Sequence, residues 1–316
     1  MFKQDFKYYK SRKPAPSFED VLNLKHPNNY KVTSVSPKNT SKTFFGLKPI
    51  ERWNVYEIVD RPGSIVRLLL INNPFTSLGQ RYWVTRCLKD YSKKPNKTNL
   101  DSHDIIPENV DWWDYSQNNI NAGVLKKLRW ATLGYHHNWD TKVYAEDMKG
   151  NFPKDLSSLC SYLTKSLGFD NFNAEAAIVN YYHLDSTLSG HTDHSEQNLD
   201  APLISLSFGQ TALFLIGGHT IDVKPTAIFL HSGDVVIMSK AARLAYHGVP
   251  RIIQSNDSSW DISPEDCSGN FVNVEKDNLR ICYDKTLWGP FEQYLRSSRI
   301  NINVRQVLHQ GQLALD

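Results

Sequence analysis

The sequence lacks several features that would define a protein class at once. Its 316 residues contain no run of about 18 apolar residues, so we expect no membrane-spanning helix. The four cysteines form no CxxC pair, which argues against a zinc ribbon or a disulfide scaffold and fits a reducing compartment. The first residues have no apolar core like that of a secretory signal, and they carry too few arginines to favour a mitochondrial presequence. No internal repeat or coiled coil is present.

The charge is nearly balanced. A formal net charge of +3 and a pI near 8.5 permit binding to nucleic acid without requiring it. The length fits one large domain with appendages. Residues 1–45 are polar and basic, so we expect an arm with one short helix that carries Phe2, Phe6 and Tyr9 on one side.

Helical and extended patterns follow one another along the chain. Residues 66–75 predict a buried strand, and residues 77–92 predict a helix with Ser77 as its cap. Leucines at helical spacing between Pro153 and Gly168 predict a second helix. From residue 175 to 248, short apolar runs alternate with Gly, Pro and Ser, which indicates an antiparallel sandwich or barrel. Residues 251–278 are polar and predict a surface insertion.

A last strand carries a row of polar side chains. At period two, Arg299, Asn301, Asn303 and Arg305 share one face, while the apolar residues between them share the other. Buried guanidiniums need an anionic partner, and two of them suit a small dicarboxylate. An exposed strand with a polar solvent face is the alternative.

Candidate metal ligands come from an HxD pair and a distant histidine. His191 and Asp193 share one side of an extended chain, and His247 is the best third ligand. Two imidazoles and one carboxylate leave open positions on iron, as an Fe(II) oxygenase needs. A second pair, His183 and Asp185, leaves the choice open on spacing alone, whereas His219 and His231 fit ordinary sheet histidines.

These motifs together resemble the AlkB family of Fe(II)- and 2-oxoglutarate-dependent nucleic-acid dioxygenases. The resemblance covers roughly residues 50–310, and residues 127–140 and 207–218 most resemble the eukaryotic AlkB homologue 1 branch. The matching blocks, in family order, are Asn180-Tyr181-Tyr182, His191-Thr192-Asp193, residues 231–249, and Arg299-x-Asn301-x-Asn303-x-Arg305. Thr or Ser is usual in the family where this chain has Asn303.

The resemblance implies a mainly β fold: a double-stranded β-helix (jelly roll) core over residues 151–316, with flanking helices. Residues 46–150 would then form an N-terminal extension with a helix-and-loop nucleotide-recognition lid. It also selects His191, Asp193 and His247 as the Fe(II) ligands. By the same resemblance Arg299 grips the distal carboxylate of 2-oxoglutarate, helped by Asn180 and Tyr182. Asn301, Asn303 and Arg305 belong to the same co-substrate motif, Asn301 and Arg305 near the end that chelates iron. Arg243 matches a family arginine, to which we assign no chemistry.

The implied activity is oxidative demethylation of methyladenine or methylcytosine in tRNA or DNA, using dioxygen and releasing succinate, CO2 and formaldehyde. A ring-carbon methyl could instead give a stable hydroxymethyl or formyl product. The base must leave its stack and lie between flat side chains. Candidates for this contact are Tyr135, His136, His137 and Asn138, with Trp113 as a second aromatic, although core or lid packing is the alternative for Trp113 and Trp139.

Two further functions stay open. The chain could oxidise protein side chains with the same metal and acid sites, or it could bind nucleic acid with an inactive metal site. We expect a monomer that acts on unpaired or flipped bases, without a membrane partner. We also expect an intracellular location in the nucleus, mitochondrion or cytoplasm.

Overall fold

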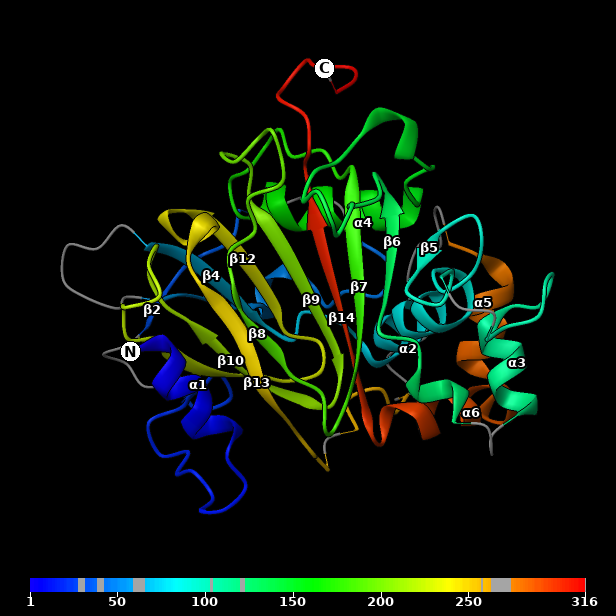
Figure 1. The fold of residues 1–316 in the computed structure, drawn as a ribbon, viewed down its shortest axis with the longest axis horizontal. Helices are drawn as coiled ribbons and strands as arrows, with labels where there is room; N and C mark the ends of the chain where they lie inside the picture. Colours follow the sequence, from blue (N-terminus) through cyan, green and yellow to red (C-terminus); the bar gives the residue numbers. More distant parts are fainter. Residues whose placement is uncertain are drawn as a thin grey trace.

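The computed structural model contains two β-sheets that face each other, with helices outside them (Figure 1). It describes residues 1–27, 32–38, 43–58, 66–102, 105–119, 123–256, 258–262 and 274–315. The major sheet has the order β2 (Val32–Ser34), β3 (Asn54–Ile58), β4 (Val66–Asn72), β12 (Val235–Lys240), β9 (Leu203–Gly209), β14 (Ser298–Arg305), β7 (Ala176–His183), β6 (Trp130–Gly134) and β5 (Lys97–Thr98). The minor sheet has the order β1 (Leu22–Asn23), β11 (Thr226–Leu230), β10 (Thr211–Ile216), β13 (His247–Ile253) and β8 (Leu188–His191).

Antiparallel pairing dominates both sheets and confirms the predicted jelly-roll class. Each of the five apolar runs between residues 175 and 248 contains one strand, namely β7, β9, β10, β11 and β12. The alternation in β14 is also confirmed. Ile300, Ile302 and Val304 are fully buried on the side of the helices, so the polar row faces the minor sheet.

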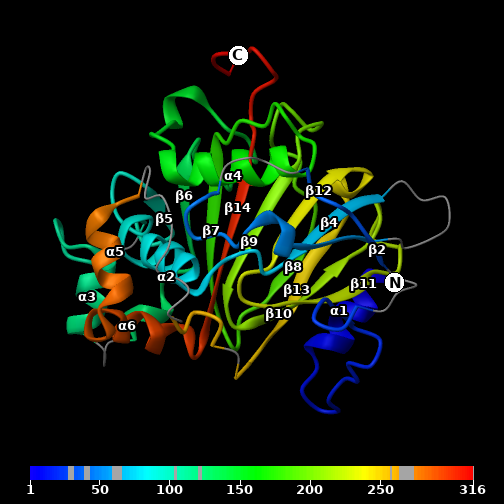
Figure 2. The ribbon, with the colours of Figure 1, turned by 180° about the vertical axis from the view of Figure 1, so that it is seen from behind.

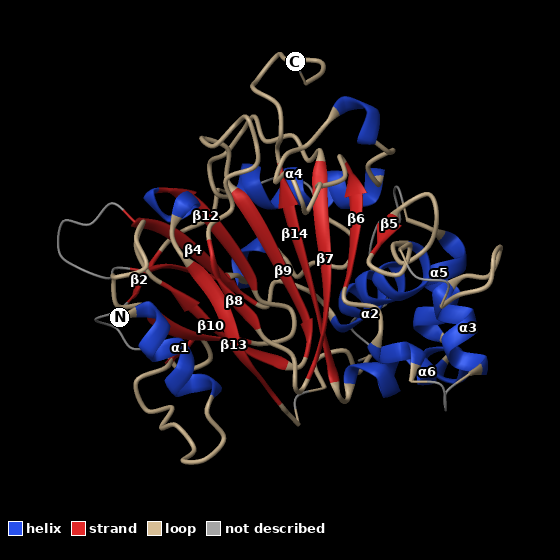
Figure 3. Ribbon diagram, in the orientation of Figure 1, coloured by secondary structure: helices blue, strands red, loops and turns tan. Residues whose placement is uncertain are grey.

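The helices lie on the outer surfaces of the sheets (Figures 2 and 3). They are α1 (Phe2–Lys10), α2 (Ser77–Thr85), α3 (Trp112–Asn118), α4 (Lys154–Ser166), α5 (Lys276–Tyr283) and α6 (Lys285–Leu295). The largest apolar cluster joins the outer face of the major sheet to α2, α4 and α6. A second cluster fills the space between the sheets, and the polar row of β14 borders it.

Two sequence predictions needed correction, one for the helix at 77–92 and one for the insertion at 251–278. Ser77 is not the cap of its helix: the hydroxyl of Thr76, whose backbone is extended, accepts a hydrogen bond of 3.1 Å from the amide of Gly79. The helix also turns into a π-helical stretch at Arg86–Asp90. Part of the predicted insertion at 251–278 is ordered instead, since β13 extends to Ile253 and α5 begins at Lys276. Residues 257 and 263–273 lie outside the described residues.

The described parts of the N-terminal arm pack against the core. Helix α1 buries Phe2 and Tyr9 on the outer face of the minor sheet, and β1 pairs with β11 as the one parallel connection among the described strands. In the part of the chain that the structure describes, no helix is long and apolar enough to cross a bilayer.

Candidate metal centre and co-substrate site

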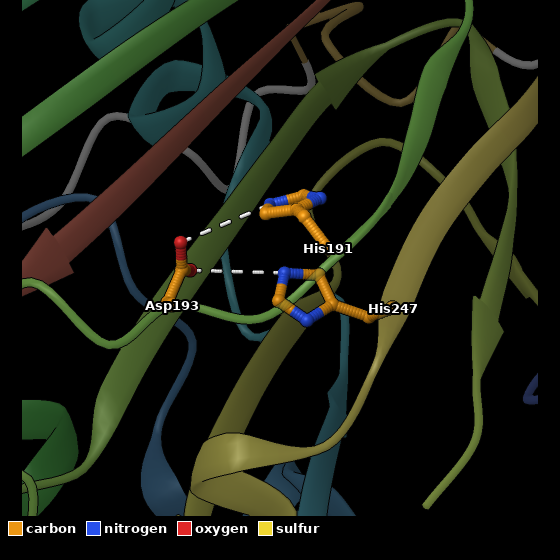
Figure 4. Close-up of side chains that lie close together, drawn as sticks. All are labelled: His191, Asp193 and His247. Atoms are coloured by element: carbon orange, nitrogen blue, oxygen red, sulfur yellow. Dashed lines mark ion pairs between the residues drawn. The ribbon is translucent and has the colours of Figure 1, made fainter. Parts of the chain in front are cut away.

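The strand pairing of the minor sheet brings two histidines together. His191 ends β8, His247 begins β13, and the two are register partners with ring centroids 4.4 Å apart. Asp193 follows two residues after His191. Its carboxylate oxygens lie 3.8 Å from His191 Nε2 and 3.7 Å from His247 Nε2 (Figure 4).

Backbone carbonyls orient both imidazole rings. His191 Nδ1 lies 2.9 Å from the carbonyl oxygen of Ser189, and His247 Nδ1 lies 3.0 Å from that of Ala245. A carbonyl can only accept, so each Nδ1 carries the proton and each Nε2 keeps a lone pair for a metal. Burial and the neighbouring His191 lower the pKa of His247 to about 4, so this ring is neutral at pH 7.

Two arginines hold the aspartate in place. Arg305 donates to Asp193 Oδ2 at 2.9 Å, and Arg243 donates to the Asp193 backbone carbonyl at 2.7 Å. Glu196 joins these arginines, with Oε1 2.9 Å from Arg305 Nε and Oε2 2.7 Å from Arg243. Burial alone would raise the pKa of Asp193, but Arg305 and the two imidazoles outweigh burial and lower it below its usual range. The carboxylate is therefore ionised.

The ligand set fits ferrous iron. The donor atoms of His191, Asp193 and His247 all lie within 4.8 Å of one another, and no other such cluster of three exists among the described residues. Two imidazoles and one carboxylate on one side leave room for a chelating acid. The other HxD pair, His183 and Asp185, is not part of such a cluster, and His183 Nδ1 bonds Ser298 Oγ at 3.0 Å.

An inner cavity extends from His247 to Arg299, between the two sheets. Only 2% of Arg299 is exposed, and its guanidinium donates to neutral oxygens of Ser207, Gln210 and Leu230. Its Nε has no partner, and no carboxylate among the described residues forms an ion pair with it. Burial lowers the pKa of Arg299 to about 10. A buried charge without a counterion fits the carboxylate of a bound acid.

The other predicted co-substrate residues lie in different places. Tyr182, Asn301 and Asn303 line the inner cavity with Arg299. Asn180 borders the outer cavity instead, so the structure does not place it with Arg299. Arg305 lies at the metal end as expected, but Asp193 and Glu196 already occupy its donors.

The outer cavity opens above the metal ligands and gives a different wall from the one predicted. His191 and Asp193 line it together with His137, Trp139, Lys142 and Tyr144. His137 Nε2 bonds Ser195 Oγ at 3.0 Å, and its ring makes edge contacts with Trp139 and Tyr144. Burial, with Arg305 and Lys142 nearby, lowers the pKa of His137 to about 4.

Four predicted substrate contacts do not line this cavity. Tyr135 is buried, with its hydroxyl 2.5 Å from Glu146, and His136 bonds Thr132. Asn138 is exposed and accepts amide hydrogen bonds within its own turn. Trp113 stacks on Phe291 at 4.6 Å in the helix-side core. Packing therefore accounts for Tyr135, His136 and Trp113, and the turn accounts for Asn138.

Sequence reasoning missed several residues that the structure brings to the site. Lys142 and Tyr144 lie just beyond the aromatic segment that resembles the family, which ends at residue 140, and Glu196 lies three residues after Asp193 without any motif of its own. Their positions depend on how the loops after β6 and β8 fold, which residue spacing does not encode. The family match pointed to Arg243, but nothing in the sequence indicated that Arg243 pairs with Glu196.

Comparisons with known proteins agree with this geometry. The family model of the 2OG-Fe(II) oxygenase superfamily matches residues 67–305. The chain is 40% identical to mouse "Nucleic acid dioxygenase ALKBH1" over 96% of this chain and 77% of that protein, and 38% identical to the human protein of the same name over 97% and 84%. It is also 32% identical to "tRNA demethylase abh1" of Schizosaccharomyces pombe, over 89% of this chain and 94% of that one.

Proposed function

This chain belongs to the AlkB family of the 2OG-Fe(II) oxygenase superfamily, in the AlkB homologue 1 branch, and we propose that it oxidises methyl groups on nucleobases of tRNA or DNA. It is a dioxygenase that uses Fe(II), 2-oxoglutarate and dioxygen. The relatives' names support nucleic acid as the substrate. We propose methyladenine or methylcytosine as the base, with formaldehyde released when an N-methyl group is removed.

The inner cavity would receive the co-substrate. His191, Asp193 and His247 would hold the iron, and Arg299 would bind the distal carboxylate of 2-oxoglutarate with a planar fork of donors. Bound iron, with 2-oxoglutarate and dioxygen, would supply the oxidation, yielding succinate and CO2. The chain itself orients both reactants and keeps Asp193 ionised through Arg305.

The outer cavity would receive an unpaired or flipped base. Trp139 borders this cavity and is 38% exposed, and the exposed part of its ring would stack on a base. Lys142 lies 5.6 Å from that ring and could contact a phosphate. His137 is neutral and would contribute hydrogen bonding rather than charge. Because one chain lines both cavities, we propose that a monomer suffices.

We also propose a reducing intracellular location, in the nucleus, mitochondrion or cytoplasm. Cys87, Cys160 and Cys282 are buried free thiols, which suits such a compartment. The proposal includes no membrane partner.

The observation that carries the function is the buried guanidinium of Arg299, which forms no ion pair with the described residues and lies in a cavity that leads to a two-histidine, one-aspartate cluster. The test supplies Fe(II), 2-oxoglutarate and dioxygen with methylated tRNA and DNA oligonucleotides. Nucleoside mass spectrometry should show loss or oxidation of the methyl group, coupled to succinate release. Unchanged oligonucleotides in the presence of an Fe(II)–2-oxoglutarate charge-transfer band would favour a protein substrate. Absence of the band would favour a binding module.

Asp193→Ala supplies the matched control for that assay. Without the carboxylate the iron loses its only anionic protein ligand, so turnover should fall to background. Affinity for the oligonucleotide should stay close to wild type, since the walls of the outer cavity remain. A variant with full activity would refute the metal assignment.

A further inference from the structure

Helix α1 packs on the outer face of the minor sheet, where it contacts β13 and β8 (Figure 1). Phe2, at the start of this helix, is 1% exposed and joins a cluster with Leu213 and Leu215 of β10. Its backbone amide donates to the carbonyl of Ile221 at 3.2 Å. The side chain is therefore fixed on the sheet rather than free in solvent.

Phe2 touches the two residues that precede the histidine ligands. A Cβ placed on Gly190 would lie 2.5 Å from Phe2 Cε1, and the three atoms nearest to it all belong to the Phe2 ring. The ring centroid of Phe2 lies 6.3 Å from that of Tyr246. Successive residues of a strand point to opposite faces, so Gly190 faces Phe2 while His191 faces the metal site. Tyr246 directly precedes β13, and it lies beside the Phe2 ring at the border of the outer cavity.

The strand that carries His191 has little other support. β8 is four residues long, forms the edge of the minor sheet and pairs only with β13. That pairing shifts register between His247 and Val249, where a Cβ on Gly248 would lie only 3.0 to 3.2 Å from the β8 backbone. Gly190 lies at this close approach and has no side chain, so it adds no packing of its own to β8.

We propose that Phe2 is a positioning residue for the iron site, because it presses on the outer side of β8 and β13 and so fixes His191 against His247. The inference rests on the proposed function, since it assumes that these histidines bind iron. Gly190 is required because any larger residue would displace the Phe2 ring. The N-terminal helix is thus part of the metal site although it lies on the opposite face of the sheet from the metal.

Anaerobic titration of Fe(II) in the presence of 2-oxoglutarate, followed by the charge-transfer band, tests the proposal. Phe2→Ala should weaken iron binding by about tenfold or more, the range seen when groups that support a metal ligand are removed. Tyr9→Ala is the matched control. It removes another buried ring from the same helix and cluster, but that ring stacks on Phe18. Tyr9→Ala should lower the melting temperature and leave iron affinity unchanged. Equal losses of iron affinity in both variants would overturn the proposal.

A double-mutant cycle tests the contact itself. Gly190→Ala should weaken iron binding in the wild-type chain because the new methyl group collides with the ring. In the Phe2→Ala background the same change should add nothing, because the colliding ring is gone. Additive losses would overturn the proposal, and Phe2→Leu carries the same cycle if the alanine variant does not fold. A wild-type chain that gives no band would overturn the iron site and the inference with it.

Discussion

At the scale of single residues, Arg299 concentrates co-substrate recognition in one buried guanidinium. Replacing it with alanine should raise the KM for 2-oxoglutarate by about 10- to 100-fold, since hydrogen bonds between charged groups contribute about 1.5–3 kcal/mol. The KM for the oligonucleotide should change little, because Arg299 does not line the outer cavity. Steady-state kinetics with each substrate varied in turn would measure both constants.

Arg299→Lys separates charge from geometry in the same assay. Lysine keeps the positive charge but cannot form the bidentate fork, so the KM for 2-oxoglutarate should lie between wild type and Arg299→Ala. Similar increases in both KM values for either variant would point to a folding defect and contradict the assignment.

Glu196 is the second residue whose chemistry can be isolated. Its side chain is 1% exposed and pairs with Arg243 and Arg305. Glu196→Gln keeps the shape but leaves the buried guanidinium of Arg243 without its carboxylate partner and Arg305 with Asp193 alone, which should cost about 3 kcal/mol of unfolding free energy or more. Urea denaturation measures this, with Glu292→Gln as a control at a solvent-exposed pair with Arg296, where little change is expected. Equal urea midpoints for the two variants would show that the buried pairs of Glu196 with Arg243 and Arg305 do not contribute to stability.

Whether a contact in the site could be predicted depends on how far apart its residues lie in the sequence. The HxD spacing and the two-residue period of β14 are local, so the sequence offered His191, Asp193 and Arg299 as candidates, and the family resemblance selected His191 and Asp193 over the second HxD pair. The pairing of Glu196 with Arg243 joins residues that are 47 positions apart. Neither residue shows a periodic pattern, and only the folded chain reveals that Arg243 bonds Asp193 while Glu196 pairs with Arg243.

At the scale of elements, the segment that follows β6 shows why the substrate wall was mispredicted. Tyr135 packs in a small cluster with Val307 and Leu308, which follow β14 at the other end of the chain. Those residues cover the ring that the family match had placed against the base. The aromatic of this segment that remains exposed is Trp139, four residues further along the chain. The composition of the segment was informative, but the covering residues decided which side chain was available.

Trp139→Ala tests the wall that the structure gives. Loss of one stacking ring should weaken oligonucleotide binding by about 1–3 kcal/mol, the usual contribution of base stacking on an aromatic side chain. The 2-oxoglutarate KM should stay unchanged, because Trp139 does not line the inner cavity. Fluorescence anisotropy with a methylated oligonucleotide would measure the affinity. Tyr135→Phe is the control: it breaks a partly buried hydrogen bond with Glu146 and should affect stability rather than binding.

At the scale of the whole molecule, the apolar runs predicted an antiparallel sandwich or barrel and the family resemblance predicted the jelly roll, but residue patterns did not give the order of the strands in space. The polar row of β14 lies between β9 and β7, so its neighbours come from residues 205–209 and 176–183. Helix α1 could be predicted as amphipathic. Its place behind β8 and β13 could not, because it depends on contacts across about 190 residues between Phe2 and Gly190.

This coupling of distant segments predicts how ligands stabilise the fold. Iron and 2-oxoglutarate bind only the assembled cavities, so each at 100 times its dissociation constant should add about 2.7 kcal/mol to the unfolding free energy. For a domain of this size we expect a rise in melting temperature of about 5 °C for each ligand, reversed by a chelator for the iron. Arg299→Ala should keep the increment from iron and lose most of that from 2-oxoglutarate, whereas Asp193→Ala should lose both. Anaerobic calorimetry would measure each protein without ligand, with iron, with 2-oxoglutarate and with both. An undiminished 2-oxoglutarate increment in Arg299→Ala would show that the diacid binds elsewhere.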